Sequence, residues 1–190
     1  MTSVLRRVLE YATTVCGGFH GRYLVVFALS HLFPRFTAGT LIAKLYCWAG
    51  FTIAEGASFV GPVTVLSGTA FEENLVIGKR VLISNNVTIN VDAMVSVGDD
   101  VSIGPFVKIY TASHPIGPGS HRMMWQIAAK PVTIERGVWI GLGATILPGV
   151  VLGYGSVVGA GSIVTSSVPP NTYVEGNPAA VVRSLPWGDR

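Results

Sequence analysis

The chain has 190 residues and a mass of 20.0 kDa, which fits one domain with a short appendage and suffices to bury a sizeable core. Hydrophobic residues make up 49% of the chain and charged residues only 12%; with 23 glycines and 11 prolines, this excludes disorder, a coiled coil and a charge-rich helical bundle. The net charge of +3, without a basic stripe, is too small for nucleic-acid binding through phosphates.

Residues 1–50 show helical periodicity. A first helix is expected because apolar residues recur there at helix spacing, namely Val4, Leu5, Val8, Leu9 and Ala12. Gly17 and Gly18 break this element, Pro34 ends a second apolar run over residues 23–33, and residues 39–48 form a third candidate. We therefore expect two or three short helices before residue 50.

The same segment is apolar and cationic, yet it lacks the features of a signal peptide or a membrane span. The run over residues 23–33 is far shorter than the ~20 residues of a spanning helix, and Glu10 interrupts the signal-like beginning. The two cysteines, Cys16 and Cys47, are too few for a disulfide scaffold, so a reduced, cytoplasmic setting is expected. We favour packing of residues 1–50 on the rest of the protein; the alternative is peripheral contact with a membrane surface.

After residue 50 the sequence repeats every six residues. Aliphatic residues keep this register without a gap at Ile134, Ile140, Ile146, Leu152, Val158 and Val164. Four positions after each stands a small or β-branched residue: Val138, Ala144, Val150, Ser156, Ser162 and Val168. The same register occurs upstream at Ile53 and Phe59, at Ile77, Ile83 and Ile89, and at Val97, Ile103 and Ile109. Two extra residues, Val95 and Ser96, displace the last of these groups.

A six-residue repeat cannot stay on one face of a helix, because six residues advance it by ~600°. A short strand followed by a sharp turn keeps the register if three such units make one triangular coil with the aliphatic residue inward. Coils stacked ~4.8 Å apart then form parallel sheets. Glycines that follow the aliphatic positions are expected to relax the corners through positive φ: Gly141, Gly153 and Gly159.

The repeat thus predicts a mainly β protein with three parts. Residues 1–50 are a helical segment, residues 51–169 are a parallel β-helix with a loop at 115–131, and residues 170–190 are an extension that packs on the coil.

The long loop begins at His114, where the repeat fails between Ile109 and Val132. A long excursion from a regular solenoid is commonly functional, so we favour a functional His114 over an ordinary histidine at a strand end. No carboxylate lies beside it in the sequence, and a backbone carbonyl is the expected orienting partner.

Several local motifs accompany this loop. Pro115 follows His114, a Val138-Trp139-Ile140-Gly141 segment resumes the coil, and the end of the chain reads AGSIVT at 160–165, VPPN at 168–171 and GNPA at 176–179. The combination resembles the hexapeptide-repeat acyltransferases, in particular the maltose/galactoside O-acetyltransferases and polysaccharide acetyltransferases. The resemblance covers residues 51–185 and implies a left-handed coil.

The resemblance implies an acetyl-CoA-dependent O-acetyltransferase acting on a hydroxyl of a sugar or of a polysaccharide or glycolipid precursor. His114 would be the general base, a role that imidazole suits because it accepts and returns protons near neutral pH. Asp92 falls where the relatives place an acidic acceptor contact, with a neighbouring acceptor segment at Ser84, Asn85 and Asn86. The two asparagines are alternatively corner residues that tolerate positive φ.

The resemblance also implies the coenzyme contacts, which are Gly141, Leu142, Ala160, Thr165 and, near the 3′-phosphate, Arg183. Trp139 would wall the thioester channel; its alternative role is to cover a coil edge. No metal is expected, because only two of the four histidines, His114 and His121, lie in the repeat region.

The sequence is also compatible with other functions. The acceptor could be serine, an amino sugar or an antibiotic, the acyl group could be longer, and the coil could be a non-catalytic scaffold. The apolar residues 1–50 disfavour free galactoside or maltose as the acceptor.

A homotrimer is expected, because a prism with few charges leaves a weakly polar side that a threefold contact would cover. A neighbouring subunit would also supply coenzyme contacts that Ser166 and Ala180 cannot.

Overall fold

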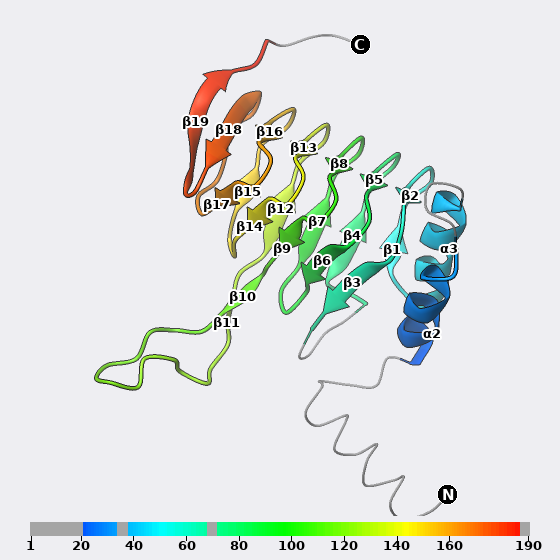
Figure 1. Ribbon diagram of the computed structural model, residues 1–190, viewed down its shortest axis with the longest axis horizontal. Helices are drawn as coiled ribbons and strands as arrows, with labels where there is room; N and C mark the ends of the chain where they lie inside the picture. Colours follow the sequence, from blue (N-terminus) through cyan, green and yellow to red (C-terminus); the bar gives the residue numbers. More distant parts are fainter. Residues whose placement is uncertain (1–20, 34–37, 68–71, 187–190) are drawn as a thin grey trace, which may run out of the picture.

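The structure is a computed structural model that describes residues 21–33, 38–67 and 72–186. Helix α2 (Gly21–Ser30) and helix α3 (Gly39–Ala49) lie side by side at one end of a long coil of strands (Figure 1). Helix α3 agrees with the third candidate in the sequence and ends at Gly50, whose φ of 115° suits glycine. The first expected helix lies outside the described residues.

The coil is a parallel β-helix with three sheets. Sheet A contains β1 (Thr52–Ile53), β4 (Leu75–Ile77), β7 (Val95–Val97), β12 (Val132–Ile134) and β15 (Val151–Leu152). Sheet B contains β2 (Ser58–Phe59), β5 (Leu82–Ile83), β8 (Ser102–Ile103), β13 (Trp139–Ile140), β16 (Val157–Val158), β18 (Thr172–Gly176) and β19 (Ala179–Ser184). Sheet C contains β3 (Val63–Leu66), β6 (Val87–Asn90), β9 (Lys108–Ile109), β14 (Thr145–Ile146) and β17 (Ile163–Val164). Within these three sheets all neighbouring strands are parallel except β19, which runs antiparallel to β18.

The repeating aliphatic residues form the core, as the six-residue register predicts. The repeating aliphatic side chain of each strand points inward and is almost fully buried, for example Ile134, Ile140 and Ile146 at 0–1% exposure, and the residue two positions before it is buried as well. The ladder pairs are in register across coils, as in Ile103 with Ile140 and Ile140 with Val158. The mainly β fold class read from the sequence is therefore confirmed.

The chain passes through sheets A, B and C in turn, so each coil has an A–B, a B–C and a C–A corner. In the regular coil, the sheet A partners Thr133 and Val151 are eighteen residues apart. The earlier sheet A partners lie twenty-four residues apart from β1 to β4, twenty from β4 to β7 and thirty-seven from β7 to β12. Because the other two steps keep the hexad spacing, all the additional residues fall at the C–A corner.

The assignment of two extra residues to Val95 and Ser96 was wrong. Both belong to β7 and pair with Leu75 and Val76, and the side chain of Val95 is fully buried. The coil instead absorbs its extra length in the turn that follows Asn90, because a turn tolerates an insertion that a paired strand does not.

The expected role of the glycines also needs correction. The glycines with positive φ are not Gly141, Gly153 and Gly159 but others, for example Gly143, with φ 68°. Gly141 is needed for close approach: a Cβ added there would lie 2.7 Å from the amide nitrogen of Ala160 on the next coil. The spacing of coils, rather than the bend of the corner, therefore requires glycine after the inward residue.

Two tyrosines from the helices cap the open edge of β3, which has no preceding strand to bond. The Tyr46 hydroxyl donates to the Val63 carbonyl at 2.7 Å and accepts from the Val63 amide at 3.0 Å. The Tyr23 hydroxyl accepts from the Val65 amide at 2.8 Å. Burial raises the pKa of both hydroxyls above the usual 10.0, so both stay protonated as donors.

We expect Tyr46→Phe to lower the free energy of unfolding by about 1–3 kcal/mol, because the buried Val63 amide loses its partner and the Val63 carbonyl keeps only the longer bond from the Tyr23 hydroxyl, at 3.4 Å. The wild type should also lose stability above pH 10.0, where the unfolded chain ionises Tyr46 and the folded chain does not. Denaturant unfolding at neutral and alkaline pH measures both effects. The contrary result is a variant as stable as the wild type with the same alkaline slope.

In the described parts of the chain, no helix has the length and apolar character needed to cross a membrane.

Candidate active site

The long excursion leaves the coil at the C–A corner and projects from it (Figure 1). Its base is a two-stranded antiparallel ladder of β10 (Ala112–Ser113) and β11 (Ala128–Ala129). A second bridge pairs Ile116 with Met123 farther out. The excursion is therefore an extended hairpin whose root is fixed on the coil.

His114 follows β10 directly, and its ring is exposed. Its Nδ1 lies 3.1 Å from the carbonyl oxygen of Gln126 on the opposite side of the hairpin. A carbonyl only accepts hydrogen bonds, so this contact places a proton on Nδ1, and in the neutral ring the lone pair is then on Nε2. The partner that orients the ring is thus a backbone carbonyl.

Asp92 lies at the same corner, in the turn between β6 and β7. Its Oδ2 accepts a hydrogen bond from Asn90 Nδ2 at 2.8 Å, and its Oδ1 lies 3.4 Å from the Ser67 hydroxyl. Asn90 Oδ1 accepts in turn from the Thr111 hydroxyl at 2.7 Å and from the Thr111 amide at 3.2 Å. Since Thr111 precedes His114 by three residues, this network ties the Asp92 turn to the root of the excursion.

Sequence reasoning missed Asn90 and Thr111. Both are buried, at 9% and 0% exposure, in a core that is mostly hydrophobic. Their positions in the sequence could have identified them, because each lies where a strand of sheet C is followed by an insertion. Buried polar groups of this kind are retained only with partners, and here each satisfies the other.

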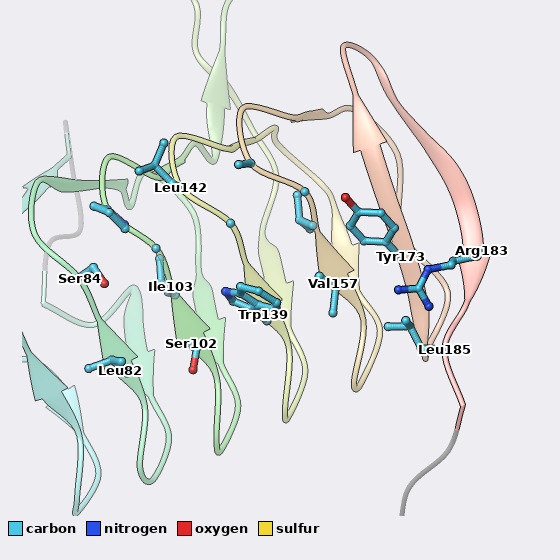
Figure 2. A pocket seen from close by; sticks show the side chains of 16 residues that line it. Leu82, Ser84, Ser102, Ile103, Trp139, Leu142, Val157, Tyr173, Arg183 and Leu185 are labelled. Carbon is cyan, nitrogen blue, oxygen red and sulfur yellow. The ribbon is translucent and has the colours of Figure 1, made fainter.

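A groove of about 810 Å³ runs along the outer face of sheet B. It crosses strands β5 to β19, as Figure 2 shows. Trp139 and Leu142 project into it with 58% and 54% of their surface exposed. Six predicted site residues line it together: Ser84, Trp139, Gly141, Leu142, Ala160 and Arg183.

One end of the groove carries a cation. The Arg183 guanidinium lies over the Tyr173 ring, 5.6 Å from its centroid, and both side chains border the groove (Figure 2). The Tyr173 hydroxyl donates to Glu175 at 2.9 Å, and this bond raises the pKa of the hydroxyl. The tyrosine ring thus holds the arginine at the groove's end, where an anion would meet it.

The remaining predicted residues lie elsewhere. Asn85 and Asn86 occupy the B–C corner, and Asn86 has φ 57°, which favours the corner role considered for it. Thr165 follows β17 at the C–A corner and is exposed. Among the described residues, those that line the groove include neither His114, Asp92 nor Thr165.

The predicted site is therefore split in two within one chain. The groove set lies on sheet B and the B–C corner, and the set around His114 lies at the C–A corner, with the width of sheet C between them. Nothing in the described ranges gathers three or more His, Cys, Asp or Glu side chains in a way that could hold a metal ion.

Comparison with known proteins adds independent information. A family model described as "Hexapeptide repeat of succinyl-transferase" matches residues 131–166. Nodulation protein L of Rhizobium meliloti is 44% identical over 132 residues, which are 68% of this chain and 72% of that protein. Galactoside O-acetyltransferase of Escherichia coli is 38% identical over 134 residues, which are 70% of this chain and 64% of that protein.

A similar solved structure is a hexapeptide-repeat-containing acetyltransferase of Vibrio cholerae in complex with acetyl coenzyme A. It superimposes with a TM-score of 0.74 at 28% identity and covers 93% of this chain and 98% of that one. The chain spans only 54–64% of the length of the first curated relatives that it matches. The hexad register, the three parallel sheets and the match over 72% of nodulation protein L together show that the chain belongs to the hexapeptide-repeat acyltransferase family.

Proposed function

We propose that this protein is an acetyl-CoA-dependent O-acetyltransferase acting on a hydroxyl of a sugar or of a polysaccharide or glycolipid precursor, with His114 as general base. The observation that carries the proposal is the bond from His114 Nδ1 to the Gln126 carbonyl, because in the neutral ring it leaves Nε2 with the lone pair that a general base needs. The names of the relatives, which include a galactoside O-acetyltransferase, support the reaction class.

The chemistry needs little more than this base. Nε2 of His114 takes the proton of the acceptor hydroxyl as its oxygen bonds to the acetyl carbonyl carbon. The carbon–sulfur bond then breaks, and the imidazolium returns the proton to the leaving thiolate. The Nδ1 bond to Gln126 keeps the ring in one tautomer and one orientation through both transfers.

The sheet B groove fits the coenzyme. Its floor is apolar where a pantetheine arm would lie, with Trp139 and Leu142 exposed and Val157 half-buried along it. The guanidinium of Arg183 at its end suits a phosphate because it is planar and permanently charged. This combination supports Gly141, Leu142, Ala160 and Arg183 as coenzyme contacts; Thr165 would reach the coenzyme only from the other corner.

We expect Arg183→Gln to raise the KM for acetyl-CoA about five- to twentyfold with little change in kcat, because a charge-assisted bond to phosphate is lost. The variant should also lose the preference for acetyl-CoA over its analogue lacking the 3′-phosphate. Arg136→Gln is the matched control, since Arg136 likewise lies over a tyrosine ring, Tyr154, at 6.0 Å. An unchanged preference in the Arg183 variant would remove this residue from the phosphate site.

Asp92 is the proposed acceptor contact. Its carboxylate is held by Asn90 and Ser67, and a carboxylate anchored in this way can accept hydrogen bonds from sugar hydroxyls. We expect Asp92→Asn to lower kcat/KM for the acceptor about tenfold and to leave the KM for acetyl-CoA unchanged. Steady-state kinetics with each substrate varied in turn separates the two. An equal loss for both substrates would indicate a structural role instead.

The activity is tested by release of free coenzyme A thiol from acetyl-CoA, alone and with carbohydrate, serine, amino-sugar and antibiotic acceptors. We expect release that depends on a carbohydrate hydroxyl. Release with none of these acceptors, from folded protein that binds acetyl-CoA, would contradict the proposal.

The split site supports a homotrimer as the working form. The C–A corner of one subunit would meet the groove of the next, and the excursion offers an apolar surface for that contact, since Ile116 and Trp125 are 85% and 81% exposed. Three sites would then form at the three subunit boundaries.

We propose that the enzyme works in the cytoplasm, where acetyl-CoA is available.

A further inference from the structure

The helix pair carries a second apolar surface that its packing on the coil does not use. The inward sides of the helices are buried through Tyr23, Val26, Ile42 and Tyr46. Their opposite sides expose a set that we call the helical face: Arg22, Leu24, Val25, Leu29, Leu32, Leu41, Lys44 and Trp48. An exposed, continuous apolar surface on two adjacent helices commonly marks an interaction site.

The side chains of the helical face are exposed to a large extent. Leu32 is 78% exposed and Trp48 is 55% exposed, so neither side chain contributes much to the core. Helices α2 and α3, which carry the face, lie at the end of the coil away from β18 and β19 (Figure 1). The sheet B groove, which extends from Leu82 to Leu185, does not include any residue of the helical face. The surface is therefore separate from the proposed active site.

The charges on the face have one sign. The segments 21–33 and 38–50 contain no Asp or Glu, and their cations are Arg22 and Lys44. The Arg22 guanidinium lies 5.7 Å from the centroid of the Trp48 ring, which places a cation beside an indole on this surface. A leucine-rich surface that also carries Trp, Arg and Lys matches the boundary of a bilayer, where rings sit at the headgroups and cations meet lipid phosphates.

We propose that the helical face is a peripheral docking surface for a phospholipid bilayer with anionic headgroups. Isologous pairing with a second copy is disfavoured, because it would bring the cations of two identical faces together. The inference does not depend on the proposed acetyl transfer, since binding to vesicles needs neither coenzyme nor acceptor. In a trimer with its threefold axis along the coil, all three helical faces would point the same way and bind one surface with added avidity.

Sedimentation of the full chain with vesicles tests the proposal. We expect binding to vesicles of phosphatidylcholine with phosphatidylglycerol and much weaker binding to phosphatidylcholine alone. Leu41→Glu should lower the partition coefficient at least about tenfold, through lost apolar burial and repulsion from the lipid phosphates. Replacing both Arg22 and Lys44 by Gln should lower it about five-fold per cation on anionic vesicles only.

Leu142→Glu is the matched control, because it makes the same change at a similarly exposed leucine of the groove, 54% against 45%. It should bind vesicles like the wild type. Quenching of tryptophan fluorescence by brominated lipid gives a second readout, which Trp48→Phe should largely remove. Circular dichroism establishes that each variant is folded.

Three outcomes would overturn the proposal: a folded wild type that does not bind anionic vesicles, equal binding by Leu41→Glu, or equal loss with Leu142→Glu. A helical face that pairs with a second copy would instead give a concentration-dependent mass that Leu41→Glu lowers, without vesicle binding, and this too would overturn it.

Discussion

Replacing His114 by Ala is expected to reduce turnover at least about 100-fold while the protein stays folded and binds coenzyme A. The reason is local. Nε2 of His114 is the only atom of that ring available to take the acceptor's proton, because Nδ1 is engaged by the Gln126 carbonyl. The groove that would bind the coenzyme contains no atom of His114, so its affinity should not change.

Two further variants separate catalysis from structure. His114→Asn keeps an N–H donor near the Gln126 carbonyl but lacks a base, and its turnover should stay as low as that of the alanine variant. His121→Ala removes another exposed histidine of the same excursion and should leave turnover within about twofold of wild type. Near-normal turnover in folded His114→Ala would refute the assignment of the base.

The second large effect is expected in the groove. Leu142→Glu places a carboxylate on an apolar wall against which the pantetheine arm would lie, and the charge loses hydration when the coenzyme binds. We expect the KM for acetyl-CoA to rise at least about tenfold. The acceptor's own affinity should not change, because Leu142 is a proposed contact of the coenzyme and not of the acceptor.

Leu41→Glu is the reciprocal control for this experiment. It makes the same substitution on the helical face and should leave the KM for acetyl-CoA at the wild-type value while lowering vesicle binding. Isothermal titration with coenzyme A measures the groove directly. Equal affinity in Leu142→Glu and in the wild type would show that the groove is not the coenzyme site.

The sequence was informative where the fold repeats. The inward position of each hexad could be read directly, because the same side-chain requirement returns every six residues and only a triangular coil satisfies it. The same regularity made the excursion after Ile109 visible as an interruption. His114 could be singled out because it stands at that interruption, although its partner, the Gln126 carbonyl, could not.

The parts that could not be predicted depend on contacts between coils. The groove collects residues as far apart as Leu82 and Leu185, which only the stacking of sheet B brings together. The Asn90–Thr111 pair joins two turns that are twenty-one residues apart. The position of Gly141 suggested a bend, and only the neighbouring Ala160 backbone reveals that the glycine serves close approach.

The separation of His114 from the groove leads to the central claim, that each active site is built from two chains. Its most direct test is co-expression of two impaired variants, His114→Ala and Leu142→Glu, followed by measurement of acetyl transfer in the mixed assembly at acetyl-CoA far below the KM of Leu142→Glu. Random association should restore about a quarter of the wild-type sites, those in which an intact His114 of one subunit meets an intact groove of the next. Activity no higher than that of either variant alone, in an assembly shown to contain both chains, would contradict the account.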